Sequence, residues 1–198
     1  MIKGIVFDLD GVYFIKGKER FSQYLEKIGI DFYEIRRVFF NSDEMNKYYK
    51  KGKWTDEQFW PWAKDQWHID QNINLVEKFI EGYETNPEIV KLVETVRAKG
   101  YKTLICSNNF PARINGLEQK FGFLKNFDTV ILSYEVGETK PSEIIFNELI
   151  KRSGLKPEEI LFIDDRSENI AAAKSLGLTA IHYKPYIELS KQLNIVLP

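Results

Sequence analysis

Two pairs of carboxylates are the residues in this sequence best suited to chemistry. Asp8 and Asp10 end the first apolar run of the chain, and Asp164 and Asp165 follow a later run of the same kind. Placing anions together is costly unless a cation or a phosphate-transfer reaction requires them. The two pairs offer four carboxylates to one cleft, and ligation by oxygen alone favours Mg²⁺. Taken alone, the first pair fits a metal site or a simple turn equally well.

Residues beside the two acid pairs could support them. Gly11 would let the backbone come close to a bound anion, because glycine has no Cβ. Asn169 is expected one turn into the next helix, where it could brace Asp164 and Asp165. Arg166 either neutralises this second pair or faces solvent.

A hydroxyl and a lysine lie between the acid pairs in the sequence. Ser107 and Asn108 follow an apolar run, where a hydroxyl and free amides suit phosphate oxygens or an ordinary turn before a helix. Lys140 precedes Pro141, which can start a helix. A cation beside the positive end of a helix is better tolerated with an anion nearby, although a solvated lysine is the simpler interpretation.

Short apolar runs alternate with helical patterns over most of the chain, which predicts βαβ units and an α/β fold with a parallel sheet. Ligands of such sheets bind beyond the carboxyl ends of the strands, where all four signals lie. The predicted strands are residues 2–9, 102–106, 129–132, 160–163 and 179–183. Helices are expected behind Pro87 and Pro141 and before Gly177, and a last helix over 187–193 is expected to close the sheet.

Residues 14–84 break this alternation and are expected to form helices only. They predict a helical insert in a core made of residues 1–13 and 85–198. All four tryptophans lie in the insert, either as its own core or, for one or two of them, as an aromatic lining of a cleft. The basic run 47–54 is either a solvated helix end or a rim that attracts phosphorylated molecules. The helices are expected at 20–28, 33–40, 44–51, after a capping box at Thr55, and at 75–82.

Composition excludes several classes of partner. The chain has 198 residues with 28 Lys+Arg and 29 Asp+Glu, so its formal charge of −1 argues against nucleic acid or an anionic membrane. Its one cysteine, Cys106, fits a reducing compartment, and no run approaches the ~18 apolar residues of a membrane span. These features predict a soluble, cytoplasmic globular protein, either a monomer or a homodimer.

The signals come in the order acid pair, hydroxyl, lysine, acid pair, and in this order the chain resembles the haloacid dehalogenase-like (HAD) superfamily. The insert resembles the cap that one subclass carries after its first motif, and the core would then be a three-layer Rossmann-like sheet. Residues 162–177 are further similar to the subgroup of sugar-1-phosphate phosphatases and the N-terminal domains of bifunctional epoxide hydrolases. The matching motifs are Phe7-Asp8-Leu9-Asp10-Gly11-Val12, Ser107-Asn108, Lys140-Pro141 and Phe162-Ile163-Asp164-Asp165.

This resemblance implies a role for each motif residue. Asp8 would be the nucleophile that forms an aspartyl-phosphate, and Asp10 the general acid and base. The metal ligands would be Asp8, Asp165 and the backbone carbonyl of Asp10, with Asp164 and Asn169 behind them. The phosphoryl oxygens would be held by Ser107 and Lys140, helped by amides near Gly11 and Asn108.

We therefore predict Mg²⁺-dependent hydrolysis of a small phosphorylated metabolite, with a sugar phosphate as the first candidate. A 2-haloacid dehalogenase typically lacks the second aspartate, so Asp10 favours phosphoryl transfer. A phosphomutase shares the same motifs, and a phosphonatase would need a Schiff-base lysine in the cap. A catalytically idle binding protein remains the alternative outside enzymes. A bacterial receiver domain is excluded, because it has no place for the insert and does not end its series of motifs on an acid pair.

Overall fold

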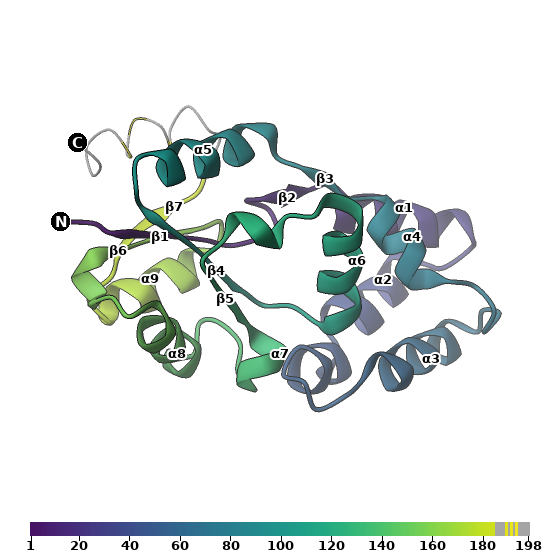
Figure 1. Cartoon of the computed structure of the whole chain (residues 1–198). Coiled ribbons are helices and arrows are strands. Elements are labelled where there is room, and N and C mark those ends of the chain that lie inside the picture. The colour runs from purple at the N-terminus through teal and green to yellow at the C-terminus, as the bar shows by residue number, and fades with distance from the viewer. Residues whose placement is uncertain (185–188, 190, 192, 194–198) are drawn as a thin grey trace.

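A computed structural model of the chain contains one five-stranded sheet of parallel strands, in the order β5-β4-β1-β6-β7 (Figure 1). The structure describes residues 1–184, 189, 191 and 193. Each predicted apolar run forms one strand, so the α/β class with a parallel sheet is confirmed. The strands are β1 (Gly4–Phe7), β4 (Lys102–Ser107), β5 (Thr129–Leu132), β6 (Ile160–Asp164) and β7 (Thr179–His182).

Strand β1 lies at the centre of the sheet, between β4 and β6. Phe7 pairs in register with Ile105 on one side and Ile163 on the other, and all three side chains are fully buried. The next residue, Asp8, still donates its N–H to the Ile163 carbonyl at 2.9 Å. The register therefore brings the residues after β1, β4 and β6 to the same edge of the sheet.

Helices cover both faces of this sheet (Figure 1). Apolar residues of α5 and α6 share one cluster with Ile5 and Phe7 of β1, whereas those of α8 and α9 share a second cluster with Val6. Alternate residues of β1 thus face opposite helical layers, as expected for a buried parallel strand. These helices are α5 (Pro87–Ala98), α6 (Pro111–Phe121), α7 (Ser133–Val136), α8 (Glu143–Ser153) and α9 (Ser167–Ser175), with short 3-10 turns η3 (Leu124–Asn126) and η4 (Pro157–Glu159).

The prediction that Pro141 starts a helix is wrong by two residues. Helix α8 begins at Glu143, because Ser142 is its N-cap and accepts a hydrogen bond from the Ile144 N–H at 3.3 Å. A serine at this position satisfies one of the free amides of the first turn. Lys140 consequently lies in the loop before the cap, free to turn toward the sheet edge.

The insert contains the five predicted helical segments, with some differences in type and bounds. Helix α3 starts after Thr55, whose N–H donates to Gln58 Oε1 at 2.9 Å, as its capping-box pattern predicts. Two of the segments contain the wider π-helical turns, which the 3.6-residue pattern does not distinguish from an α-helix. The predicted helix 33–40 is formed by two consecutive elements, α2 and η1, so six elements make up the five segments. They are α1 (Gly17–Lys27), α2 (Phe32–Ile35), η1 (Arg36–Phe40, π), η2 (Glu44–Tyr49, π), α3 (Asp56–Trp67) and α4 (Leu75–Glu81).

The expectation that residues 14–84 are helical throughout is wrong at both ends. Strand β2 (Phe14–Ile15) pairs antiparallel with β3 (Glu84–Thr85), so the chain enters and leaves the insert as a two-stranded ribbon. Strands of two residues are too short to show a period of two in the sequence.

The aromatic residues of the insert form a core that continues into α6. Trp60 and Trp67 are buried in it, and the ring of Phe110, just before α6, stacks on Tyr49 with centroids 4.6 Å apart. The first turn of α6 is also held from the insert, because the Ala112 N–H donates to Asp56 Oδ1 at 3.1 Å. The large side chains therefore serve mainly as a core, which the insert shares with α6.

Two further expectations concern the chain as a whole. The last helix expected over 187–193 lies mostly outside the described residues. None of the helices in the described part of the chain is long and apolar enough to cross a membrane.

Candidate active site

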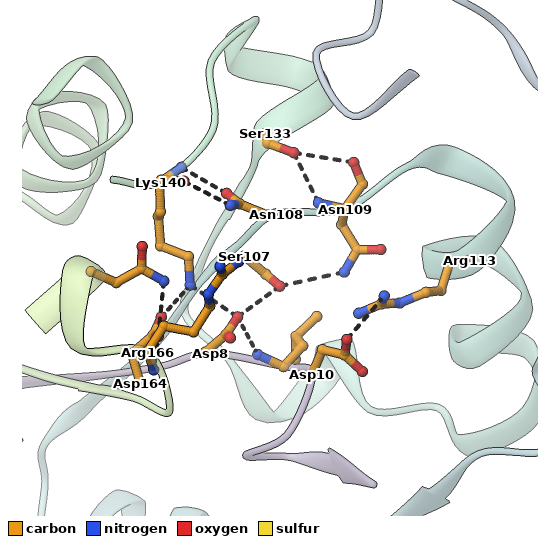
Figure 2. A network of polar contacts seen from close by, with 12 residues as sticks. Asp8, Asp10, Ser107, Asn108, Asn109, Arg113, Ser133, Lys140, Asp164 and Arg166 are labelled. Atoms are coloured by element: carbon orange, nitrogen blue, oxygen red, sulfur yellow. Dashed lines mark hydrogen bonds and ion pairs between the residues drawn. The ribbon is translucent and has the colours of Figure 1, made fainter. Parts of the chain in front are cut away.

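Asp8 lies at the edge of the sheet directly after β1 and is 6% exposed. Its Oδ1 accepts hydrogen bonds from Ser107 Oγ at 2.9 Å and from the Leu9 N–H at 2.8 Å (Figure 2). Lys140 Nζ lies 2.9 Å from the same oxygen. Burial raises the pKa of Asp8, and the charge of Lys140 opposes this rise. The predicted nucleophile, hydroxyl and lysine thus meet at one atom.

Lys140 is almost fully buried, and two carboxylates share its charge. Its Nζ lies 2.6 Å from Asp164 Oδ2 in addition to its contact with Asp8. Burial lowers the pKa of Lys140, but the two anions outweigh it and hold that pKa above its ordinary value. The Asn108 side chain fixes the backbone here, donating to the Lys140 carbonyl at 2.9 Å and accepting from the Lys140 N–H at 2.7 Å. Asn108 thus positions the lysine through its main chain.

Asp164 has both carboxylate oxygens engaged. Oδ2 contacts Lys140, while Oδ1 accepts from Asn169 Nδ2 and from the Arg166 N–H, each at 2.9 Å. Asn169 is 2% exposed and comes from the first turn of α9. The structure therefore brings Asn169 to the acid pair, as the spacing predicts, and uses Asp164 to hold Lys140 in place.

Asp165 completes a cluster of three carboxylates. Oxygens of Asp8, Asp164 and Asp165 all lie within 4.8 Å of one another. Desolvation, together with the charges of Asp8 and Asp164, raises the pKa of Asp165 to about 6. A cation among these oxygens would relieve the repulsion that raises this pKa.

Gly11 lies against this cluster. It has φ +84°, and a Cβ at this position would overlap the Asp165 carboxylate. The sequence predicted that Gly11 allows an anion to approach the backbone closely, and the group that does so in the structure is the side chain of Asp165. An L residue here would meet both an unfavourable backbone conformation and this contact.

Asp10 turns toward Arg113, away from Asp8 and Lys140 (Figure 2). Its Oδ2 contacts Lys18 Nζ and lies 3.5 Å from Arg113 Nη1. Burial alone would raise the pKa of Asp10, but Arg113 and Lys18 lower it to about 2. Asp10 is therefore negatively charged in this arrangement.

The residues described above surround a cavity of about 290 Å³. Asp8, Lys140 and Asp165 line it from the core, whereas Lys18 and Lys50 line it from the insert. None of the four tryptophans is among the described residues that line it, so the alternative of an aromatic lining by tryptophan is not supported. Pro141 is the single apolar side chain in the described part of the lining, which makes the cavity suited to a charged ligand.

Two cations of this cavity, Lys18 and Arg113, were not predicted from the sequence, and Lys50 was predicted only as one residue of the basic run 47–54. Arg113 is 2% exposed and stands one turn before Leu117 on the buried side of α6, so a charged residue at an apolar position was the available signal. Lys50 belongs to the basic run 47–54, but no pattern distinguished it from its neighbours.

The basic run 47–54 agrees in part with each of its two interpretations, a solvated helix end and a rim that attracts phosphorylated molecules. Lys50 lines the cavity, as the functional interpretation requires. Lys47 is exposed and pairs with Asp43 at 2.9 Å, and Lys51 pairs with Glu138 at 2.7 Å. Only part of the run is therefore available to a ligand in the cavity.

The family model of the haloacid dehalogenase-like hydrolases matches residues 2–177 of this chain. The chain belongs to this hydrolase family. As a HAD-like hydrolase it is 26% identical over 204 residues to D-ribitol-5-phosphate phosphatase of Bacteroides thetaiotaomicron, over 100% of this chain and 99% of that protein. It is 28% identical to glyceraldehyde 3-phosphate phosphatase of Methanocaldococcus jannaschii, over 91% of this chain and 84% of that protein.

Solved structures of HAD-like proteins share the fold. An enzyme of this family from Bacteroides thetaiotaomicron, in complex with magnesium and inorganic phosphate, superposes with a TM-score of 0.80 at 24% identity, covering 93% of this chain and 95% of that one. A predicted HAD-like hydrolase from Porphyromonas gingivalis gives a TM-score of 0.76 at 26% identity, covering 98% of both chains. The predicted resemblance to the HAD superfamily and its Rossmann-like core is confirmed.

Proposed function

We propose that this HAD-like hydrolase is a Mg²⁺-dependent phosphatase that hydrolyses a small phosphate monoester, with a sugar phosphate as the first candidate. The observation that carries the proposal is the buried Asp8 carboxylate, held at one oxygen by Ser107 and Lys140 beside a cluster of acids. Relatives named as phosphatases of ribitol 5-phosphate and glyceraldehyde 3-phosphate support the choice of substrate class.

Asp8 is the proposed nucleophile. Its carboxylate oxygen attacks the phosphorus atom, a bond forms between them, and the bond from phosphorus to the ester oxygen breaks. The aspartyl-phosphate that results is hydrolysed by water, which releases inorganic phosphate and restores Asp8. Dividing the reaction in this way replaces one difficult step by two easier ones.

Asp10 is the proposed acid and base of these two steps. It gives a proton to the leaving ester oxygen, and then removes a proton from the attacking water. Lys18 and Arg113 favour its charged form while the cavity holds no anion. A phosphoryl group beside Asp10 supplies negative charge that favours the protonated form needed for the first step.

Lys140 and Ser107 are the proposed phosphoryl-binding residues. Attack by a carboxylate on a phosphate dianion needs positive charge close to the reacting atoms. Lys140 supplies that charge from a buried position, where it is less screened than at the surface. Asn108 and Asp164 keep this lysine in place through its main chain and its Nζ.

The donor set fits Mg²⁺, because the three clustered carboxylates offer only oxygen atoms. We assign Asp8, Asp165 and the carbonyl of Asp10 as ligands. Asp164 is left out because its oxygens already accept bonds from Lys140 and Asn169. When bound, the ion would neutralise charge on the phosphoryl oxygens as they pass through the transition state.

The insert is the proposed cap of this active site. Residues 14–84 would cover a core made of residues 1–13 and 85–198, and Lys18 and Lys50 of the insert complete the cavity wall. Covering the cavity limits access of water to the aspartyl-phosphate and gives the insert a part in selecting the substrate.

Phosphate release from p-nitrophenyl phosphate tests the proposal. We expect release with Mg²⁺, loss of it in EDTA, and recovery when Mg²⁺ is added back. Asp8→Asn is expected to lower the rate by about 10³-fold or more, since it removes the nucleophile. Asp43→Asn is the matched control, because Asp43 is exposed and lies on the insert surface.

Two results would contradict the proposal. Release that persists in Asp8→Asn would exclude this residue as the nucleophile. Chloride release from a 2-chloroacid without metal would instead indicate a dehalogenase. A panel of sugar phosphates, assayed for kcat/KM, then identifies the leaving group within the phosphatase class.

A further inference from the structure

Three cations lie together on the Asp10 side of the cavity, and none of them binds the phosphoryl group in the chemistry proposed above. Lys18 comes from α1, Lys50 follows η2, and Arg113 comes from α6. All three line the cavity together with Asp10. Figure 2 shows Arg113 and Asp10 on one side, and Asp8 with Lys140 on the other.

Arg113 has donors that nothing described in the structure satisfies. Its side chain is 2% exposed, and its Nε and Nη2 atoms have no hydrogen-bond partner among the described residues. The rings of Tyr83 and Phe110 lie 5.4 Å and 5.9 Å from its Cζ and hold the guanidinium in place. A buried guanidinium with free N–H donors is unfavourable unless an acceptor forms hydrogen bonds with them.

Two carboxylates lie beside the three cations on this side of the cavity, Asp10 and, next to Lys18, Asp165. Asp10 contacts Lys18 and lies 3.5 Å from Arg113. Lys50 Nζ donates to the neutral Asn46 Oδ1 at 2.9 Å and pairs with no carboxylate among the described residues. Burial and the charges of Lys18 and Arg113 lower the pKa of Lys50 to about 7. The three cations outnumber the two carboxylates beside them, Asp10 and Asp165, so an added anion would be stabilised.

We propose that Lys18, Lys50 and Arg113 form a second anion subsite, which binds an acidic group on the leaving-group side of the substrate. The substrate class is then a small phosphate monoester that also carries a carboxylate or a second phosphate, such as a phosphorylated sugar acid. This inference rests on the proposed phosphatase function, which places the phosphoryl group at Asp8 and Lys140. Asp10, as the acid for the leaving oxygen, lies between the two subsites.

The size of the cavity agrees with this class. Its volume of about 290 Å³ is at the lower end of ligand cavities, so it suits a leaving group of a few carbon atoms. In an ester of that length, the phosphoryl group and the acidic group could occupy the two subsites at the same time.

Matched pairs of esters test the subsite by kcat/KM in the presence of Mg²⁺. The first pair is 2-phosphoglycolate and 2-hydroxyethyl phosphate, and the second is 3-phosphoglycerate and glycerol 3-phosphate. Within each pair only the carboxylate differs from a hydroxymethyl group. Ethylene glycol bisphosphate distinguishes a second phosphate from a carboxylate. We expect the acidic member to be preferred by about tenfold to a hundredfold, mainly through KM, since charge-assisted contacts are the stronger ones.

Substitution of Lys50 shows whether the subsite causes this preference. Lys50→Gln is expected to lower the preference about tenfold, while Lys47→Gln, which neutralises an exposed lysine of the same run, keeps it. Arg113→Lys retains a charge but removes the fork of donors, and is expected to give an intermediate preference. The proposal would be overturned if the wild-type chain gave equal kcat/KM within both pairs and no preference for ethylene glycol bisphosphate over 2-hydroxyethyl phosphate. An unchanged preference in Lys50→Gln would also overturn it.

Direct binding keeps this test independent of turnover. Titration calorimetry of Asp8→Asn with Mg²⁺ is expected to show tighter binding of 2-phosphoglycolate than of 2-hydroxyethyl phosphate, and a smaller difference when Lys50→Gln is added. Equal affinities for 2-phosphoglycolate, ethylene glycol bisphosphate and 2-hydroxyethyl phosphate would overturn the subsite. Failure to hydrolyse any ester, including p-nitrophenyl phosphate, would overturn the phosphatase function instead, while the calorimetry still decides on the subsite.

Discussion

Lys140 Nζ lies 2.9 Å from Asp8 Oδ1, so the proposed nucleophile and the proposed phosphoryl-binding cation already form a buried ion pair. Asp164 holds the same nitrogen at 2.6 Å from the other side. Because these three groups are at most 6% exposed, each depends on the others for compensation of its charge. The proposed active site and the stability of the fold are therefore coupled at Lys140.

Removal of the Lys140 charge is the first prediction. Lys140→Met leaves the Asp8 and Asp164 carboxylates buried without their cation, and we expect it to lower the free energy of unfolding by about 3–5 kcal/mol. Urea denaturation measures this change. Lys151→Met is the control, because Lys151 is 79% exposed and its loss should change stability by less than about 0.5 kcal/mol. Equal stability of the two variants would show that the buried pair does not support the fold.

The second prediction separates the proton transfer by Asp10 from its other effects. Asp10→Asn keeps the backbone carbonyl but cannot donate or accept the proton. We expect kcat/KM to fall by about 10²–10⁴-fold for an alkyl phosphate. The loss should be smaller for p-nitrophenyl phosphate, because its leaving group stabilises its own charge. An equal loss for both esters would exclude Asp10 as the acid.

The third prediction compares two glycines of nearly the same conformation. Gly11 has φ +84° and Gly100 has φ +87°, but a Cβ would overlap Asp165 only at Gly11. Both Gly→Ala variants should lose about 1–2 kcal/mol of stability from backbone strain. Only Gly11→Ala should also weaken Mg²⁺ binding, measured by calorimetric titration, because it displaces Asp165. Identical Mg²⁺ affinities would contradict our assignment of Asp165 as a ligand.

Stability against pH provides the fourth prediction, at Lys50. Its pKa is lowered to about 7 from an ordinary value of 10.5, so between these values the unfolded chain binds the extra proton and the contribution of Lys50 to stability rises with pH. Below about pH 7 Lys50 is charged in both the folded and the unfolded chain, so it destabilises the fold by its full amount. Lys50→Gln should therefore raise the melting temperature more at pH 6 than at pH 10. The same gain at both pH values would show that the pKa of Lys50 is not lowered in the folded chain.

The strand ends could be predicted from the sequence because one physical rule places them. Parallel strands finish at the same edge, so the residues at the carboxyl ends of β1, β4 and β6, or directly after them, must meet there whatever helices intervene. Asp8, Ser107 and Asp164 were found in this way. Lys140 was found by its order in the series, although its helix starts two residues later than expected.

The other side of the cavity could not be predicted in this way. Lys18 and Lys50 line the cavity together with residues far from them in the sequence, and no local period in the sequence predicts contacts of this kind. The two-residue strands β2 and β3, which pair where the chain enters and leaves the insert, are also too short to show a period of two in the sequence. Arg113 differs from these residues, because a charged residue at an apolar position of α6 is a signal that can be read from the sequence.

Helix α6 is attached both to the insert and to the sheet. Asp56 accepts a hydrogen bond from the Ala112 N–H, Tyr49 stacks on Phe110, and Lys120 Nζ donates to the Tyr83 carbonyl at 2.9 Å. Apolar residues of the same helix pack with Ile5 and Phe7 of β1. Arg113 is therefore held at a fixed distance from Asp8 and Lys140, so the cavity should select a substrate by its length as well as by its charge.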